Sequence, residues 1–171
     1  MSSRTYGQFC GFARALEVVG ERWALLILRD LLVEPKRFTD LHCGLPGIPT
    51  NVLTARLKEL EAAGVVRRHV LPRPQGSVVY ELTDYGAELE PVILELGRWG
   101  AKALDAPRHG EIITVESLIM AMRTTFRARN ARGLRAKLHR VAWSACCALR
   151  TIESALRTSS ERVTYQPASK A

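Results

Sequence analysis

Residues 44–64, GLPGIPTNVLTARLKELEAAG, decide the fold of this chain. The stretch opens with the turn-forming residues 44–47 and continues with leucines at the spacing of one helical face. Pro49 suits the first position of a helix and Gly64 suits its C-terminal end, so the pattern predicts a helix over residues 49–63. The buried stripe of this helix consists of Leu53, Leu57 and Leu60.

The flanking sequence predicts further helices before this stretch and a hairpin after it. Helical spacing of apolar residues predicts helices over residues 11–19, 22–33 and 38–45, and the second is apolar nearly all round, as is typical of a core helix. Residues 65–71 and 77–82 are rich in β-formers and are joined by a turn-rich connector. Thr83 is expected to cap one last helix of this region, and Pro91 to kink it.

This order of elements predicts a mainly α fold with a small β-hairpin. The two helices around residues 44–47 form a helix-turn-helix, and the hairpin makes it the winged variant. In such a motif the second helix enters the major groove of DNA. The face opposite the leucine stripe is therefore the candidate recognition surface, with Thr50, Asn51, Thr54, Ala55, Arg56 and Lys58 as its candidate residues.

These candidates differ in the contact each can make. Asn51 can read adenine by two hydrogen bonds, and Lys58 is better placed for phosphate. Thr50 lies at the helix start, where backbone N–H groups attract phosphate. Arg56 falls between Val52 and Leu60 on the buried side, so a structural role is favoured slightly over DNA contact. On the hairpin, the expected phosphate and minor-groove contacts come from Arg67, Arg68, Arg73 and Gln75.

Net charge is distributed unevenly along the 171 residues. Residues 1–106 have no net charge, and the whole excess of +8 lies in residues 107–171. A nucleic-acid function of the first part therefore has to rest on local arrangement, not on overall charge. No apolar stretch reaches the length of a membrane span, the N-terminal residues contain no apolar core of signal-peptide length, and the cysteine spacing indicates no disulfide framework. We expect a cytoplasmic protein without membrane insertion.

Several segments of the chain resemble HxlR-type winged helix-turn-helix regulators, which are related to the MarR group. They are residues 10–32 (CGFARALEVVGERWALLILRDLL), 37–41 (RFTDL), 45–66 (LPGIPTNVLTARLKELEAAGVV), 80–86 (YELTDYG) and 89–100 (LEPVILELGRWG). The resemblance covers about residues 7–104 in unbroken order. It implies a bacterial or archaeal transcription regulator that binds pseudo-palindromic double-stranded DNA as a homodimer. The chain departs from the family at Pro49, where serine is usual, and at Gly11, where proline is frequent.

Two further expectations concern assembly and sensing. Apolar side chains of the first and last helices of residues 7–106 are expected to form the homodimer contact: Phe12, Leu16, Ile93, Leu96 and Trp99. Cys10 immediately precedes a helix, where the helix dipole favours a thiolate. In some members of the resembling family, a cysteine at this position senses oxidants or electrophiles. The alternative is that Cys10 simply packs beside Phe9 or Phe12.

The expected domain organisation is an arm (residues 1–6), a DNA-binding and dimerisation domain (7–106) and a basic, helical C-terminal extension (107–171). Residues 115–135 resemble the start of a sterol-carrier-like domain, so the extension is either a distinct appendage or the remnant of such a domain. An amphipathic helix is expected near residues 134–152, and a general binder of nucleic acids or anionic surfaces is the alternative function. The sequence contains no paired catalytic motif and predicts no enzyme activity, metal or cofactor; an effector is not indicated.

Overall fold

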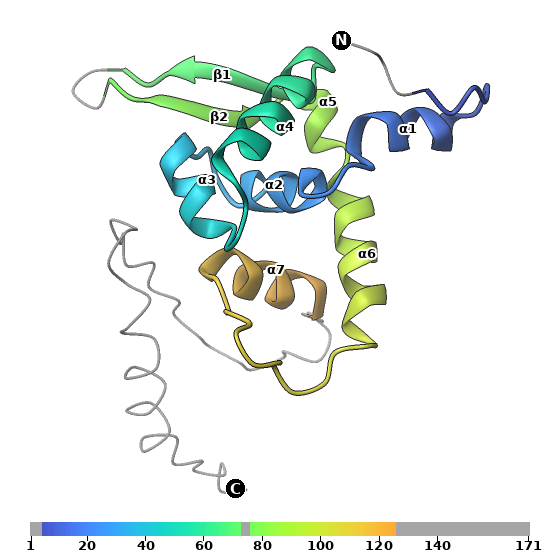
Figure 1. The fold of residues 1–171 in the computed structure, drawn as a ribbon, viewed down its shortest axis with the longest axis vertical. Helices are drawn as coiled ribbons and strands as arrows, with labels where there is room; N and C mark the ends of the chain where they lie inside the picture. Colours follow the sequence, from blue (N-terminus) through green and yellow to red (C-terminus); the bar gives the residue numbers. More distant parts are fainter. Residues whose placement is uncertain (1–4, 73–75, 126–171) are drawn as a thin grey trace, which may run out of the picture. The chain divides into compact units, whose positions relative to one another are not determined.

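The computed structural model describes residues 5–72 and 76–125. These residues lie in one compact unit, residues 1–134, and a second unit, residues 135–171, falls outside the described part, as does the amphipathic helix expected near residues 134–152. The elements, drawn in Figure 1, are α1 (Gly11–Val19), α2 (Ala24–Leu31), α3 (Phe38–Gly44), α4 (Thr50–Ala62), β1 (Val66–Val70), β2 (Val78–Leu82), α5 (Asp84–Ala87), α6 (Glu90–Ala101) and α7 (Val115–Thr125). The predicted mainly α fold with one hairpin is confirmed.

The β1–β2 hairpin is antiparallel, with Val66 opposite Leu82 and Val70 opposite Val78. A third short segment joins its edge, because Lys36 pairs with Tyr80 through two backbone hydrogen bonds of 3.0 and 2.8 Å. Since Lys36 lies two residues before α3, this pairing attaches the segment that leads into α3 to the hairpin.

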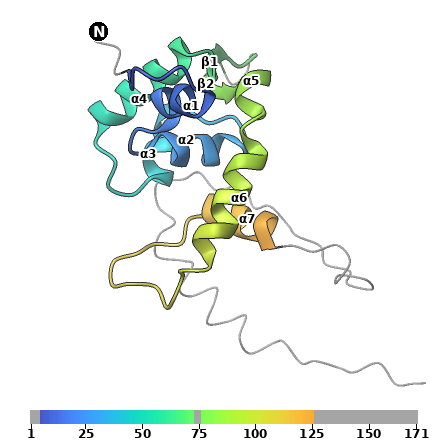
Figure 2. The same cartoon turned by 90° about the vertical axis from the view of Figure 1, so that its right-hand side faces the viewer.

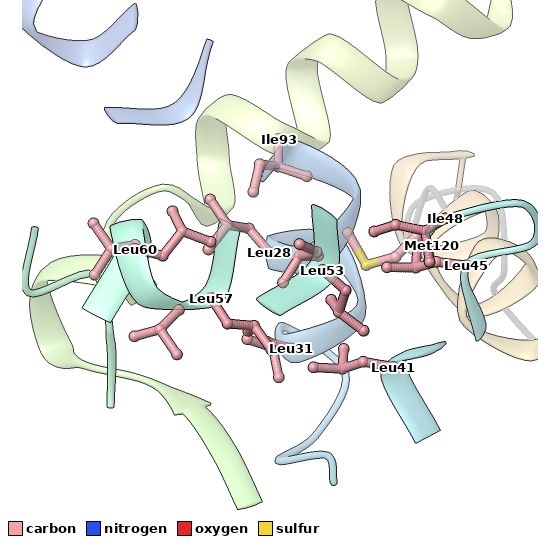
Figure 3. Close-up of a cluster of buried hydrophobic side chains, with 13 residues drawn as sticks. Leu28, Leu31, Leu41, Leu45, Ile48, Leu53, Leu57, Leu60, Ile93 and Met120 are labelled. Carbon is pink, nitrogen blue, oxygen red and sulfur yellow. The ribbon is translucent and has the colours of Figure 1, made fainter. Parts of the chain in front are cut away.

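The hydrophobic core forms around α2 and the inner face of α4 (Figure 3). Ile27 and Leu28 of α2 are fully buried, which explains why that helix is apolar on nearly every side. The three leucines predicted as the α4 stripe, Leu53, Leu57 and Leu60, are at most 1% exposed. Burying a leucine side chain contributes about 1.5–3 kcal/mol. The stripe therefore fixes which face of α4 is turned to solvent.

The boundaries of two helices differ from the sequence-based expectation. The second helix begins at Ala24 and not at residue 22, because Trp23 adopts a left-handed conformation with φ of +81° that interrupts helical geometry. The Arg22 guanidinium lies 5.3 Å from the centre of the Trp23 ring. Pro49 is the extended residue before α4, not its first helical residue, so α4 begins at Thr50.

The expected kink at Pro91 is wrong. The chain forms two helices here, the short α5 and then α6, and Pro91 lies in the first turn of α6. A first-turn residue has no intrahelical partner for its N–H group, so proline costs no hydrogen bond there. Thr83 caps α5 as predicted, since its hydroxyl accepts a hydrogen bond of 3.0 Å from the Gly86 N–H group.

Helix α7 returns to the domain after the loop that follows α6 (Figures 1 and 2). It packs against both α6 and α2, and Met120 belongs to the hydrophobic core at 5% exposure. Helical structure, expected for residues 107–171 as a whole, is thus present in α7, which ends at the limit of the described part. The boundary expected after residue 106 remains a prediction, and the contacts of α7 add this helix to the surface of the folded domain.

A charged cluster is buried where α7 meets α2. Asp30 is fully buried; one carboxylate oxygen accepts a hydrogen bond of 2.8 Å from Arg29, and the other has no hydrogen-bond partner among the described residues. Burial raises the pKa of Asp30 to about 6, while the nearby guanidinium of Arg29 opposes this rise. Because the folded pKa lies above the ordinary value of 3.8, protonation of Asp30 stabilises the fold.

We expect the contribution of Asp30 to stability to be lost as the pH rises through about 6. When the pH rises from 5 to 7.5, the free energy of unfolding of the wild type should fall by about 1 kcal/mol more than that of Asp30→Asn. Urea unfolding across this pH range measures the difference. Asp105→Asn, in an exposed loop, is the control and should follow the wild type. Equal pH dependence of Asp30→Asn and the wild type would contradict the assignment.

Candidate nucleic-acid interface

The turn between α3 and α4 places the start of α4 at the protein surface. Gly47 has a φ of +82°, which favours glycine, and the Ile48 N–H group closes the turn with a hydrogen bond of 3.1 Å to the Leu45 carbonyl. Leu45 and Ile48 are buried on either side of the exposed tip. The turn is thus anchored to the core by its apolar side chains while its backbone faces solvent.

The face of α4 opposite the leucines is open to solvent. Thr50, Asn51 and Lys58 are exposed, and Thr54 and Ala55 are half-buried. The Thr54 hydroxyl donates a hydrogen bond of 2.8 Å to the Thr50 carbonyl, which orients its oxygen toward the helix backbone. The first turn of this helix therefore presents two exposed side chains that can hydrogen-bond, Thr50 and Asn51.

One interaction at the start of α4 was missed by the sequence reasoning. Nε2 of His42 lies 3.3 Å from the Thr50 hydroxyl, and the imidazole stacks on the Phe38 ring at 6.5 Å between ring centres. These residues connect the exposed side of α3 to the first residue of α4. Their spacing of four along the sequence could have indicated the Phe38–His42 pair, because residues four apart share a helical face. The contact with Thr50 depends on the tertiary turn.

Arg56 is the exception among the α4 candidates. Its side chain is 17% exposed and forms ion pairs with Glu59 of α4 and, at 3.5 Å, with Glu21 in the segment after α1. The guanidinium is thus held within the domain, which agrees with the structural role favoured from its position on the helix.

The two described basic residues of the hairpin differ in availability. Arg67 is exposed but hydrogen-bonds to Glu81 on the opposite strand. Arg68 is exposed and has no ion-pair partner among the described residues, so its charge is available to a phosphate. The other two predicted wing residues, Arg73 and Gln75, lie outside the described part of the chain.

Cys10 lies exposed at the start of α1. The backbone N–H groups of Ala13 and Phe12 are directed toward its sulfur, short of full capping geometry, and lower the pKa of the thiol. One turn along α1, the Arg14 guanidinium pairs with Glu17 at 2.9 Å. The packing alternative for Cys10 does not hold, because the residue is exposed.

The residues expected to form the homodimer contact separate into two groups. Phe12, Leu96 and Trp99 are 73%, 45% and 70% exposed, and Leu16 is half-buried. Ile93, by contrast, is 7% exposed and belongs to the hydrophobic core of its own chain. The apolar surface available on α1 and α6 therefore excludes Ile93.

The folded elements and the exposed α4 face define a winged helix-turn-helix protein. A family model described as HxlR-like helix-turn-helix matches residues 18–108, and the chain belongs to this family. It is a transcriptional regulator of the HxlR type, and its relatives are named as transcriptional regulators, a non-enzymatic role. Within the described residues, no helix is long and apolar enough to span a membrane, and no cluster of His, Cys, Asp and Glu could hold a metal ion.

Individual relatives support this assignment. The uncharacterized regulator YvaP of Bacillus subtilis is 38% identical over 94 residues, which are 55% of this chain and 87% of YvaP. The regulator YodB of the same organism is 40% identical over 85 residues, covering 50% of this chain and 76% of YodB. A solved structure of the redox regulator HypR in its oxidized form is 34% identical, with a TM-score of 0.52, and covers 57% of this chain and all of that chain.

Replacement of Arg68 by alanine should weaken binding to all DNA sequences. Because Arg68 has no competing ion pair within residues 5–72 and 76–125, its loss should lower the slope of log affinity against log salt by about 1. Fluorescence anisotropy with random duplex DNA at several salt concentrations measures this slope. Lys102→Ala removes the same charge at the end of α6, outside the basic extension, and should leave the slope unchanged. A normal slope for Arg68→Ala would show that the hairpin does not contact phosphate.

Proposed function

We propose that this HxlR-type regulator acts in the cytoplasm as a homodimer that recognises a pseudo-palindromic operator through α4. The observation that carries the proposal is the exposed polar face of α4, presented directly after a core-anchored turn. An α-helix with small and polar side chains on its outer face fits the major groove. Thr50, Asn51, Thr54, Ala55 and Lys58 form this surface, with Arg68 and the predicted wing residues beside it.

Within this surface the residues have different roles. Asn51 is proposed to read a base edge, because its amide has both a donor and an acceptor to offer an adenine. Thr54 and Ala55 allow close approach to the groove floor. Lys58 and the backbone N–H groups at Thr50 contact phosphate, a role that the absence of any side-chain cap on α4 supports. Arg56 is proposed to hold α4 in place instead of touching DNA.

Substituting Asn51 by alanine should reduce discrimination between operator and random DNA by about 1–3 kcal/mol, because one bidentate base contact is lost. Lys58→Ala, in contrast, should lower the affinity for operator DNA and for random DNA to a similar extent. Competition binding of the full-length protein to its own upstream region, with random DNA as competitor, measures the ratio. If Asn51→Ala retains full operator preference, α4 is not the recognition helix.

The homodimer is proposed to form through the exposed apolar side chains of α1 and α6. Phe12, Leu96 and Trp99 are large, apolar and open to solvent in the single chain. Pairing of such surfaces about a two-fold axis places two recognition helices about one DNA turn, roughly 34 Å, apart. Sedimentation of the operator complex in the competition assay should give two chains per duplex, and one chain per duplex would contradict the dimer.

Cys10 is the proposed sensor of electrophiles. Its exposed position and lowered thiol pKa favour the reactive thiolate, and a similar protein, HypR, is named a redox regulator. The thiolate sulfur forms a bond to a ring carbon of a quinone, and the ring takes up the electron pair and a proton. Because Cys10 begins α1, a bulky adduct there changes the packing of the proposed dimer surface around Phe12.

Cys10→Ser should bind the operator normally but should no longer be released from it by a quinone. Serine preserves the size of the side chain and removes the nucleophile. Gel-shift assays with and without the quinone measure release, and mass spectrometry locates the adduct. Cys43→Ser, at the end of α3, is the control and should be released like the wild type. If Cys10→Ser is released from the operator at the same quinone concentration as the wild type, Cys10 is not the sensor.

The division into an arm, residues 1–6, a DNA-binding domain, residues 7–106, and a basic extension, residues 107–171, remains our proposal. The extension holds the entire net positive charge, so we assign it the non-specific, salt-sensitive part of DNA affinity. Its first helix, α7, has a separate role that its contacts suggest.

A further inference from the structure

Helix α7 lies beyond the segment that matches the family model, yet its buried side chains reach the helix-turn-helix. Glu116, in its first turn, accepts a hydrogen bond of 2.7 Å from the Lys36 ammonium group. The Lys36 side chain is only 7% exposed, and its backbone precedes α3 and pairs with β2. Glu116 is therefore bound to the point where α3 begins.

The same carboxylate also lies against the opposite end of α3. A Cβ atom placed on Gly44, the last residue of α3, would lie 3.7 Å from Oε2 of Glu116 and 3.1 Å from Oδ2 of Asp30. Glu116 thus contacts the surroundings of both ends of this seven-residue helix. Burial alone would raise the pKa of Glu116, but the hydrogen bond from Lys36, a backbone N–H group and the positive charges of Lys36 and Arg29 together outweigh burial and hold the pKa below its usual value, so the carboxylate stays ionised.

One turn further along α7, Met120 packs into the core beside the turn. It belongs to the same buried cluster as Leu45 and Ile48, and Figure 3 shows the three side chains at the same end of this cluster. Ile48 lies two residues before α4 begins. A displacement of these turn residues therefore displaces the first turn of α4, which carries Asn51.

The C-terminal half of α7 is attached to a different element. Arg123 pairs with Glu90 of α6, and the Arg98 guanidinium of α6 donates a hydrogen bond of 2.9 Å to the Thr124 carbonyl. The outer side of α7, with Val115 and Leu118, remains exposed. The helix thus uses one end to hold the turn and the other to hold α6.

We propose that α7 is a strut that positions the recognition helix relative to α6, with Glu116 and Met120 as positioning residues for DNA binding. A binding surface has to be held to within about 0.5 Å by packed neighbours to work efficiently. The buried side chains that anchor the turn, Leu45 and Ile48, pack partly against Met120. Helix α7 therefore determines how firmly the turn holds α4. The effect on operator affinity rests on the proposed function of α4, whereas the mechanical coupling does not.

Hydrogen exchange of the full-length protein without DNA tests the coupling directly. In Met120→Ala, the amides of Leu45, Gly47 and Ile48 in the turn should exchange about tenfold faster or more, while those of β1 keep their wild-type rates. Met120→Leu should restore slow exchange, because leucine refills most of the volume. The matched control is Met122→Ala on the same helix, where the methionine is 40% exposed, and it should resemble the wild type.

Operator binding of the same variants gives the second measurement. Met120→Ala should bind its operator about tenfold more weakly at a temperature where it is fully folded, and Met120→Leu should not. Glu116→Gln keeps the side-chain size and removes the carboxylate charge, which weakens the attraction to Lys36 and also relieves the repulsion with Asp30, so it should change both readouts in the same direction but less. Glu111→Gln, in the exposed loop before α7, is its control.

The proposal fails if exchange in the turn and in β1 rises by the same factor, because α7 then contributes only global stability. It also fails if Met120→Ala exchanges like the wild type. If Met120→Ala does not fold, Glu116→Gln takes its place. The proposal then fails if Glu116→Gln raises exchange in the turn and in β1 by the same factor, or if it exchanges like the wild type. Faster exchange in the turn without any operator binding by the wild type would leave the strut intact and contradict the proposed function of α4.

Discussion

The burial of one face of α4 is the constraint on which the rest of the structure depends. Leu53, Leu57 and Leu60 are removed from water against α2, which is itself apolar on nearly all sides. Rotating α4 about its axis would expose these leucines, at a cost of about 1.5–3 kcal/mol for each. The opposite face, with Asn51 and Lys58, is consequently held toward solvent. The interface for DNA is thus a consequence of how the core packs.

Positioning of the interface involves charged groups as well as apolar ones. The turn before α4 is fixed by Leu45 and Ile48, whereas the two ends of α3 lie near buried charges from α2 and α7. Buried ion pairs add little net stability because desolvation offsets their attraction, but their geometry is demanding. The hydrogen bond between Glu116 and Lys36 therefore links α7 to the segment before α3 without adding much net stability.

Charge on the interface is local and selective. The first 106 residues have no net charge, and several arginines are engaged by carboxylates of the same domain. Arg56 and Arg67 illustrate this, since Glu59 and Glu81 hold them, while Lys58 and Arg68 face solvent without such partners among the described residues. A count of basic residues would overestimate the positive charge that the interface offers to DNA, because ion pairs within the domain engage some of these residues. The basic residues outside such pairs are the ones available to phosphate.

The order of the elements, the buried stripe of α4, the hairpin and the cap at Thr83 follow from the sequence alone, because helical and strand periodicity and turn chemistry are local properties. The accessibility of the candidate residues depends on long-range packing. Ile93 shares a helix with Leu96 and Trp99, yet it is buried in its own chain, and Arg56 is held by Glu21, which is 35 residues away in the sequence. The packing of α7 against the helix-turn-helix could not be predicted from local sequence patterns either, because the contact of Glu116 with Lys36 joins residues 80 positions apart. Periodicity reports which residues share a face, whereas the neighbour that covers the face is set by packing across the whole domain.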